Sequence, residues 1–405
     1  MAPARHVIVA GAGIAGLTAA LALARAGLRI TVLEQAAKLE ETGAGIQLSP
    51  NATRVLIALG LRERLQPSVM APQAIRVMAG GSGREIVRIP LGSFAERRYG
   101  APYWTIHRGD LQSALAAAVQ STQDIELRLG TRVEDFAIHG NGITAQAHCG
   151  QRVLDERGLA LIGADGMWST LSARIQGRRP PRFCHRTAWR TLVPANAVPE
   201  EFREPLVHLW LGPDAHLVHY PVKGGRLINI VGIVHDEWRE IGWSAPGNRA
   251  EILRHFVRWS WAEKARALIA IPEQWLKWAL YDRKAPFRAG VGPVTLIGDA
   301  AHPMLPFLAQ GAGMAIEDAA VLADMLGKYL DDPADALRAY EGARWHRTAL
   351  AQLKSRRQGR IYGLSGPQAL LRNLALRAMG GEKLLSRYDW LYTWRPPERF
   401  ASEPT

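Results

Sequence analysis

A glycine-rich loop near the N-terminus constrains the fold of this chain more than any other feature. The segment GAGIAG, residues 11–16, joins an apolar run expected to form a strand, His6–Ala10, to an Ala/Leu-rich segment expected to form a helix, Ile14–Ala26. Glycines here permit a tight turn and let the backbone approach a pyrophosphate at the positive end of the helix. A second strand is expected at Arg29–Glu34, and Glu34 stands where a carboxylate can accept hydrogen bonds from ribose hydroxyls. The sequence therefore predicts a βαβ unit that binds a dinucleotide.

Two later motifs indicate which dinucleotide this loop would bind. GADG at residues 163–166 follows a strand predicted at Leu159–Ile162, and GDAAHP at residues 298–303 follows a strand predicted at Val294–Ile297. Each apolar run ends in glycine and aspartate, which is the composition of a turn. An NAD-dependent dehydrogenase has a loop like residues 11–16 but needs neither later motif, so the two later motifs discriminate between the classes.

In order and spacing, the three segments resemble the fingerprints of the flavoprotein aromatic hydroxylases, the single-component FAD monooxygenases related to para-hydroxybenzoate hydroxylase and salicylate hydroxylase. The resemblance covers nearly the whole chain. Two further segments, GAGIQLSPN at residues 43–51 and WLGP at residues 210–213, are most similar to the salicylate and 3-hydroxybenzoate hydroxylase branch. Other family-like segments are HRGDL (107–111), WALYDR (278–283) and LPFLAQG (305–311). The resemblance implies tightly bound FAD and a transient reductant, NADH or NADPH.

The expected fold class is α/β: a Rossmann-like FAD-binding domain with a parallel sheet, interleaved with an antiparallel-sheet substrate domain and followed by a C-terminal helical segment. The FAD-binding domain would comprise residues 1–70, 100–180 and 285–330, the substrate domain residues 71–99 and 181–284, and the helical segment residues 331–405. Strands separated by Gly/Pro turns are predicted in the substrate domain at Arg186–Val193, Leu206–Leu211, His216–Val222 and Arg226–Val234. Apolar spacing predicts later helices at Ala312–Leu326, Ala334–Arg360 and Gln368–Tyr388.

Composition limits the class of protein. The 405 residues are 48% hydrophobic and 21% charged, as in a globular protein with a sizeable core. The two cysteines, Cys149 and Cys184, lack the spacing of a disulfide framework or a metal site, so we expect no metal and a reducing, cytoplasmic compartment. We also expect no secretion signal and no membrane span, because no apolar stretch is long enough to cross a bilayer.

The net charge of +13 raises nucleic acid as a partner class. The arginines are scattered rather than gathered with stacking aromatic residues, so we expect no nucleic acid and favour an anionic small molecule. The densest basic stretch, Arg344–Arg360, falls on a predicted helix and is expected to be a solvated face rather than a docking surface. A monomer or a homodimer is expected.

Family roles carried over by position imply a set of cofactor contacts. Asp299 would accept hydrogen bonds from the ribityl hydroxyls of FAD, Arg108 would reach the ribityl-phosphate region, and Asp165 would lie beside the dinucleotide where NAD(P)H must also pass. Free N–H groups at the start of the helix after Gln310 would face the pyrimidine edge of the flavin. The predicted cofactor-binding residues are Gly11, Gly13, Ala15, Gly16, Glu34, Gln35, Gly45, Ile46, Arg108, Asp165, Asp299, Gly311, Ala312, Gly313 and Met314.

The chain departs from the family pattern after the second fingerprint. The family often places an arginine three residues after the serine equivalent to Ser169, but Ser172 stands there and the nearest arginine is Arg174. No role is therefore carried over for that arginine.

The segment HLVHY, residues 216–220, carries the predicted catalytic groups. Strand side chains alternate, so His216 and Tyr220 share one face and His219 points to the other. In the 3-hydroxybenzoate and 6-hydroxynicotinate hydroxylases a similar His and Tyr lie over the reactive face of the flavin. His216 is therefore predicted to be the base that removes a phenolic proton, with a purely structural histidine as the alternative. The predicted substrate contacts are Gln47, His216, Tyr220 and Pro306, and His302 is not assigned a catalytic role.

The resemblance implies that NAD(P)H reduces FAD, that the reduced flavin forms a C4a-hydroperoxide with dioxygen, and that an aromatic ring takes the terminal oxygen. A hydroxybenzoate-like carboxylic acid is the expected substrate. One alternative is an FAD-dependent reductase or oxidase of an isoprenoid or polyketide-like substrate on the same fold. Another is a redox-responsive FAD sensor that uses the basic helix as a partner surface. The particular aromatic acid, the position of hydroxylation and the choice between NADH and NADPH stay open.

Overall fold

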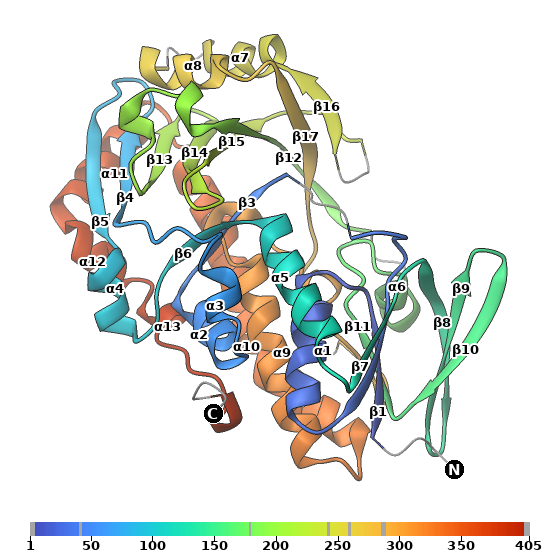
Figure 1. Ribbon diagram of the computed structural model, residues 1–405. Coiled ribbons are helices and arrows are strands. Elements are labelled where there is room, and N and C mark those ends of the chain that lie inside the picture. Colours follow the sequence, from blue (N-terminus) through green and yellow to red (C-terminus); the bar gives the residue numbers. More distant parts are fainter. Residues whose placement is uncertain are drawn as a thin grey trace.

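The computed structural model describes residues 5–39, 43–177, 180–240, 244–257, 261–284 and 289–400 (Figure 1). The N-terminal residues 1–4, from which we expected no secretion signal, lie outside the described residues, as does the expected domain boundary at residue 285. No helix in the described ranges combines the length and the hydropathy needed to cross a bilayer.

A five-stranded parallel sheet forms the first layer of the molecule, in the order β18-β11-β1-β2-β7. Its strands are β1 (His6–Ala10), β2 (Arg29–Leu33), β7 (Ile125–Arg128), β11 (Ala160–Gly163) and β18 (Val294–Leu296). The helices α1 (Ile14–Arg25) and α5 (Arg108–Gln120) pack on this sheet, and α9 (Gly311–Lys328) packs against α1. The predicted α/β class is confirmed. The strands come from distant parts of the chain, so the layer is discontinuous in sequence.

An eight-stranded sheet forms the second layer, in the order β16-β17-β12-β15-β14-β13-β4-β5. Its strands are β4 (Ala74–Ala79), β5 (Glu85–Pro90), β12 (Arg182–Pro194), β13 (Leu206–Gly212), β14 (Ala215–Val222), β15 (Leu227–His235), β16 (Ala245–Asn248) and β17 (Gln274–Asp282). All neighbours are antiparallel except β4 and β13, which are parallel. The four predicted strands are present, and the first of them is longer than expected.

One face of the eight-stranded sheet is covered by α7 (Arg249–Val257) and α8 (Glu263–Ala270), at the top of Figure 1. Four tryptophans, Trp189, Trp210, Trp261 and Trp275, are almost fully buried there. The other face, which we call the inner face, looks toward the parallel sheet and α9. The side chains of alternate residues along each strand therefore point either into this tryptophan-rich core or toward the FAD-binding layer.

Two smaller sheets were not predicted. One contains β8 (Thr131–His139), β9 (Gly142–Cys149) and β10 (Arg152–Gly158), and projects at the right edge of Figure 1. The other pairs β3 (Gly45–Leu48) with β6 (Trp104–His107) and lies between the two main layers. The short helices that complete this part of the fold are α2 (Pro50–Ala58), α3 (Arg62–Leu65), α4 (Gly92–Tyr99) and α6 (Thr170–Gln176).

The C-terminal part is helical, as predicted, but one expected helix is wrong. After α10 (Pro333–Tyr362), the segment Gln368–Tyr388 divides into α11 (Gly366–Met379) and α12 (Gly381–Ser386), followed by the short α13 (Asp389–Tyr392). Gly380 has φ +71° and ends α11, since this conformation is left-handed. A Cβ on Gly381 would lie 1.9 Å from the carbonyl oxygen of Arg88, so the two glycines let the chain turn closely against β5.

We expected the basic stretch Arg344–Arg360 of α10 to be a solvated face, and this is wrong for the N-terminal end of the stretch. Arg344 is 3% exposed and forms ion pairs with Glu317 and Asp318 of α9. Arg357 and Arg360, at the other end of the basic stretch, are exposed as expected. This end of the basic stretch therefore joins α10 to α9 through buried ion pairs and is not available to solvent.

Two stacked histidines in the tryptophan-rich core predict how stability depends on pH. The rings of His208 and His219 lie 4.3 Å apart, and none of their four nitrogens has a hydrogen-bond partner among the described residues. Burial lowers the pKa of His208 from 6.5 to about 4 and that of His219 well below 6.5. Unfolding frees both rings to bind protons, so the free energy of unfolding should fall as the pH drops from about 6.5 toward 4.

Each histidine should contribute about 1.4 kcal/mol per pH unit to this loss. The slope is measured by denaturant unfolding at about pH 7.5, 6 and 5, values that lie above and within the range where the unfolded rings bind protons. Replacing both rings by phenylalanine, His208→Phe with His219→Phe, should flatten the slope, whereas changing the exposed His346 to Gln should not. An unchanged slope in the double variant would contradict this assignment.

Candidate functional site

The glycine loop has the geometry predicted for a dinucleotide-binding turn. Gly11 has φ +107°, and a Cβ on it would lie 2.5 Å from the carbonyl oxygen of Ala164. A Cβ on Gly16 would lie 1.8 Å from the carbonyl oxygen of Gly11. No atom lies within 4 Å of the position that a Cβ on Gly13 would take. Gly11 and Gly16 are therefore required by the turn itself, whereas Gly13 leaves its backbone accessible to a ligand.

Glu34 is held beside this loop at the end of β2. Its Oε2 accepts a hydrogen bond from the backbone N–H of Ala12 at 2.6 Å, and its Oε1 accepts one from the N–H of Ala36 at 2.8 Å. These bonds fix the carboxylate at the mouth of the loop, where ribose hydroxyls would lie. The next residue, Gln35, is exposed.

The loops after β11 and β18 meet the glycine loop. Ala164 approaches Gly11 and Gly16, and a Cβ on Gly298 would lie 3.0 Å from the Cβ of Ala15. The structure thus brings the three sequence motifs to one edge of the parallel sheet, at the carboxyl ends of β1, β11 and β18. This edge is where α/β sheets bind their ligands.

Two carboxylates and two guanidinium groups gather at this edge. Burial raises the pKa of Asp165, whose Oδ2 accepts from the N–H of Leu171 at 3.3 Å while the buried Oδ1 has no partner among the described residues. Asp299 is exposed, and desolvation by the neighbouring protein raises its pKa against the opposing charges of His302, Arg108 and Arg283. Desolvation likewise lowers the pKa of Arg108 and of Arg283.

The N-terminus of α9 faces Asp299. The position of a Cβ on Gly311 lies 4.0 Å from Asp299 Oδ1, and Gly311 and Ala312 are partly exposed. The first N–H groups of a helix have no partner within the helix, so those of the segment 311–313 can donate to an anionic ligand. Met314 differs, because its N–H donates to the carbonyl of Gln310 and its side chain is fully buried.

A buried polar network holds this helix N-terminus in place. Gln310 Nε2 donates to Ser49 Oγ at 2.8 Å, and Asn51 Nδ2 donates to Gln310 Oε1 at 3.1 Å and to Glu317 Oε1 at 2.6 Å. Glu317 and the adjacent Asp318 are fully buried in α9. Residues 49–51, which follow β3, are therefore hydrogen-bonded to the first two turns of α9.

The same network continues to the loop after β18. Arg344 donates to Asp318 Oδ1 at 2.7 Å, and Asp318 Oδ2 contacts His302 Nε2 at 2.6 Å and accepts from the N–H of Gly298 at 3.0 Å. Despite burial, the neighbouring His302 and Arg344 lower the pKa of Asp318 to about 2. His302 therefore stabilises the loop after β18 through Asp318. This network was not predicted from the sequence. The feature that could have indicated it is the pair Glu317–Asp318 within an otherwise apolar helix.

His216 and Tyr220 lie on the inner face of the eight-stranded sheet, as the alternation predicted, while His219 points into the opposite core. His216 packs against Phe307 and Tyr362, with ring centroids 5.5 and 5.2 Å away. Burial lowers its pKa from 6.5 to about 3, with Arg186 acting in the same direction. The imidazole is therefore neutral in the ligand-free protein.

Tyr220 lies at the other end of this face and interacts with Gln47. Gln47 also accepts a hydrogen bond from the hydroxyl of Tyr103 at 2.7 Å, and burial raises the pKa of Tyr220. The β3 strand is fixed over the sheet because the N–H of Gly45 donates to Asn229 Oδ1 at 2.7 Å. The structure thus brings Gln47 and Tyr220 together, with Gly45 and Ile46 on the same short strand.

Between His216 and Tyr220 on the inner face, the side chains are less buried. Val218 is the one residue of β14 that is not buried, and Val231, its partner on β15, is also partly exposed. Pro306 begins the turn Pro306–Leu308 and is partly exposed, while Phe307 is buried against His216. The residues around this partly exposed position are a neutral base, a phenol, an amide and apolar side chains.

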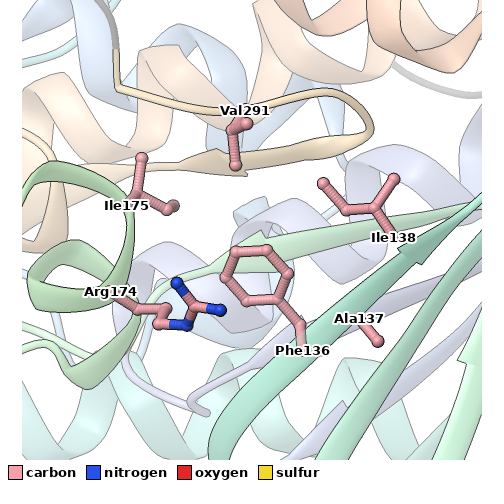
Figure 2. Close-up of a pocket in the computed structure, with 6 residues that line it drawn as sticks. All are labelled: Phe136, Ala137, Ile138, Arg174, Ile175 and Val291. Atoms are coloured by element: carbon pink, nitrogen blue, oxygen red, sulfur yellow. The ribbon is translucent and has the colours of Figure 1, made fainter.

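A separate surface hollow of about 450 Å³ lies between β8 and α6, beside Val291 (Figure 2). Arg174 lies on its wall, over the ring of Phe136 and in an ion pair with Asp135 at 2.8 Å. This arginine is the one displaced from the family position, and the structure places it on the outer surface with partners of its own.

Comparisons with known proteins agree with this arrangement. The family model described as "FAD binding domain" matches residues 4–353. The chain is 38% identical to 3-hydroxybenzoate 6-hydroxylase 1 of Aquipseudomonas alcaligenes, over 98% of this chain and 99% of that protein. It is 40% identical to 3-amino-4-hydroxybenzoate 2-monooxygenase PtmB3 of Streptomyces platensis, over 96% and 95% of the two chains.

Solved structures give the same result. The fold matches a salicylate hydroxylase substrate complex with a TM-score of 0.82 at 26% identity, covering 99% of this chain and 98% of that one. It matches HpxO of Klebsiella pneumoniae, complexed with FAD and uric acid, with a TM-score of 0.84 at 25% identity and 97% coverage of each chain.

Proposed function

The chain belongs to the family of FAD-binding aromatic hydroxylases, and from this premise we propose that it hydroxylates a phenolic carboxylic acid of the hydroxybenzoate type, using NADH or NADPH and dioxygen. The observation that carries this proposal is the row of inner-face residues on β14, where a neutral histidine and a phenol flank the partly exposed Val218. Relatives that act on 3-hydroxybenzoate and 3-amino-4-hydroxybenzoate support the same class of substrate.

The residues at the sheet edge fit FAD. Gly13 leaves room for the pyrophosphate, Glu34 is placed for the adenosine ribose, and Asp299 and Arg108 are placed for the ribityl-phosphate region. The open N–H groups of residues 311–313 suit the pyrimidine edge of the flavin, which becomes negative on reduction. When bound, FAD supplies the redox chemistry that activates dioxygen with electrons from NAD(P)H.

The protein's own groups prepare the substrate. In its neutral form His216 can accept the proton of the substrate hydroxyl, and the phenolate that results is a better nucleophile. Because burial makes the free imidazole a weak base, the negative charge of a bound phenolate must stabilise the protonated ring. Phe307 and Tyr362 cover the other side of His216 and keep water from it. Tyr220 and Gln47, which interact with each other, lie at the opposite end and are positioned to hydrogen-bond to a polar substituent of the substrate.

The limits of the domains are part of the proposal. We place the FAD-binding domain at residues 1–70, 100–180 and 285–330, the substrate domain at residues 71–99 and 181–284, and the helical segment at residues 331–405. The paths of the parallel and eight-stranded sheets support this division.

The proposed function is tested by supplying the FAD-loaded protein with NAD(P)H and a panel of hydroxybenzoates. An active acid should accelerate NAD(P)H oxidation and yield hydroxylated product in equal amount. Product formed without dioxygen would instead indicate a reductase, and hydrogen peroxide as the sole product across the panel would refute the proposed substrate class.

Two substitutions in the glycine loop should separate its effect on folding stability from its effect on FAD affinity. Gly16→Ala places a methyl group against the carbonyl of Gly11 and should lower both the thermal stability of the FAD-free protein and its flavin content. Gly13→Ala has space for its methyl group, so the FAD-free protein should keep its stability while the affinity for FAD falls. Thermal unfolding and the ratio of flavin to protein absorbance measure the two effects. Equal behaviour of the variants would show that the loop serves packing alone.

A further inference from the structure

One arginine on the inner face, Arg190, has no ion-pair partner among the described residues. Arg190 belongs to β12, and its guanidinium lies 3.9 Å from the centroid of the Trp278 ring, which fixes its plane by a cation–π contact. Its buried Nε has no hydrogen-bond partner among the described residues. No carboxylate in the described chain pairs with it, and the ionisable groups that influence it are Tyr220 and Arg108.

A guanidinium that is partly removed from water and has no anionic partner is unfavourable, because the lost hydration is not replaced. Burial lowers the pKa of Arg190 to about 10 for this reason, although the group stays protonated at neutral pH. By contrast Arg186, on the same strand and face, donates toward the carbonyl of Asp214 and lies over the ring of Phe307. Arg190 is thus poised for an anion that the chain itself does not supply.

The strand register places Arg190 in the same row as the partly exposed Val218 and Val231. Arg190 pairs with Val231 of β15, which pairs with Val218 of β14, so the three share one row across the inner face. His216 lies one row away on β14 and Tyr220 lies one row away on the other side. The three members of the Arg190 row are all partly exposed, whereas His216 and Tyr220 are buried.

Strand spacing gives the dimensions of this arrangement. Two strand intervals separate β12 from β14, roughly 10 Å, and one row along a strand is about 7 Å. A substrate ring lying over Val231 and Val218 would therefore have His216 at one side and Arg190 at another. These are the two polar groups that a hydroxybenzoate needs, an acceptor for the hydroxyl proton and a cation for the carboxylate.

We propose that Arg190 binds the substrate carboxylate and thereby directs the hydroxyl of the ring toward His216. The assignment rests on the proposed function, because it requires an aromatic acid over the middle row of the inner face. A planar guanidinium can bind a carboxylate through two parallel hydrogen bonds, which also fixes the orientation of the ring. The stacked Trp278 holds the guanidinium ready for this contact without donating or accepting at its edge.

The test measures binding rather than turnover. Calorimetry on the FAD-loaded protein, without NAD(P)H, compares 3-hydroxybenzoate, salicylate and 4-hydroxybenzoate with the uncharged 3-hydroxybenzamide. For wild-type protein we expect binding of at least one of the acids. In Arg190→Gln the affinity for that acid should fall roughly 10- to 100-fold, as expected for loss of a charge-assisted contact, while the affinity for the amide should change about threefold or less. Arg186→Gln is the matched control and should keep the wild-type preference.

Three results would overturn the assignment. Equal affinities of wild-type and Arg190→Gln protein for the acids would show that another group binds the carboxylate, as would a selective loss in Arg186→Gln. Release of FAD from Arg190→Gln, seen as lower flavin absorbance per protein, would assign the arginine to the cofactor. If wild-type protein binds none of the three acids, the proposed substrate class itself fails, and that outcome is distinct from equal binding by both proteins.

Discussion

Replacing His216 by alanine is expected to lower the rate of hydroxylation roughly 100-fold or more, because the substrate hydroxyl loses its proton acceptor. Reduction of FAD by NAD(P)H should change far less, since His216 lies on the sheet of the substrate layer, packed against Phe307 and Tyr362. Stopped-flow absorbance of the flavin and quantitation of product separate the two steps.

The control for this variant lies on the same strand. His219 points into the opposite core, so His219→Phe should leave both steps close to wild type. If His216→Ala slows reduction and hydroxylation by the same factor, His216 is a structural residue. Activity of the variant restored at high pH, where the substrate is already a phenolate, would support the role of a base.

Replacing Arg344 by glutamine is expected to destabilise the protein by about 3 kcal/mol, because it removes a buried cation shared by two buried carboxylates. Glu317 keeps its ion pair with Arg347, and Asp318 keeps its contact with His302. Arg344 joins Glu317 to Asp318, and these two residues hold the start of α9 and the loop at Gly298. Denaturant unfolding of the FAD-loaded and FAD-free forms measures the loss. The affinity for FAD should fall as well, because both ends of the network border the proposed cofactor site.

A matched arginine on the same helix serves as the control. Arg338 pairs with Asp335 on the surface, and both side chains are 57% exposed. Arg338→Gln should therefore change the free energy of unfolding by about 1 kcal/mol or less. A loss in Arg344→Gln no larger than in Arg338→Gln would contradict the structural role assigned to the buried network.

Local patterns predicted the parts of the site that depend on neighbouring residues. The turn at Gly11 and Gly16 follows from steric demands within a few residues, and the shared face of His216 and Tyr220 follows from strand alternation. The α/β order followed from strands that end in glycine and aspartate. These features lie within short segments, so the sequence displays them directly.

Other parts depend on pairing between distant segments. The position of Arg190 in the row of Val231 and Val218 is set by the register of β12, β15 and β14, which no local pattern reveals. The contact of Arg344 with Asp318 joins residues on two helices, so a basic stretch that looked solvated includes a buried ion pair. The strands β8 to β10 have many exposed side chains and lack the apolar runs that revealed the buried strands. The helix break at Gly380 depends on close packing of Gly381 on β5.

The most direct test of the proposed function is turnover under isotopically labelled dioxygen. The FAD-loaded protein, NAD(P)H and the hydroxybenzoate that binds it best are incubated under ¹⁸O₂, and the product is analysed by mass spectrometry. We predict that each product molecule carries one labelled oxygen atom and that one NAD(P)H is oxidised per product. Unlabelled product, or NAD(P)H oxidation that yields only hydrogen peroxide, would contradict it.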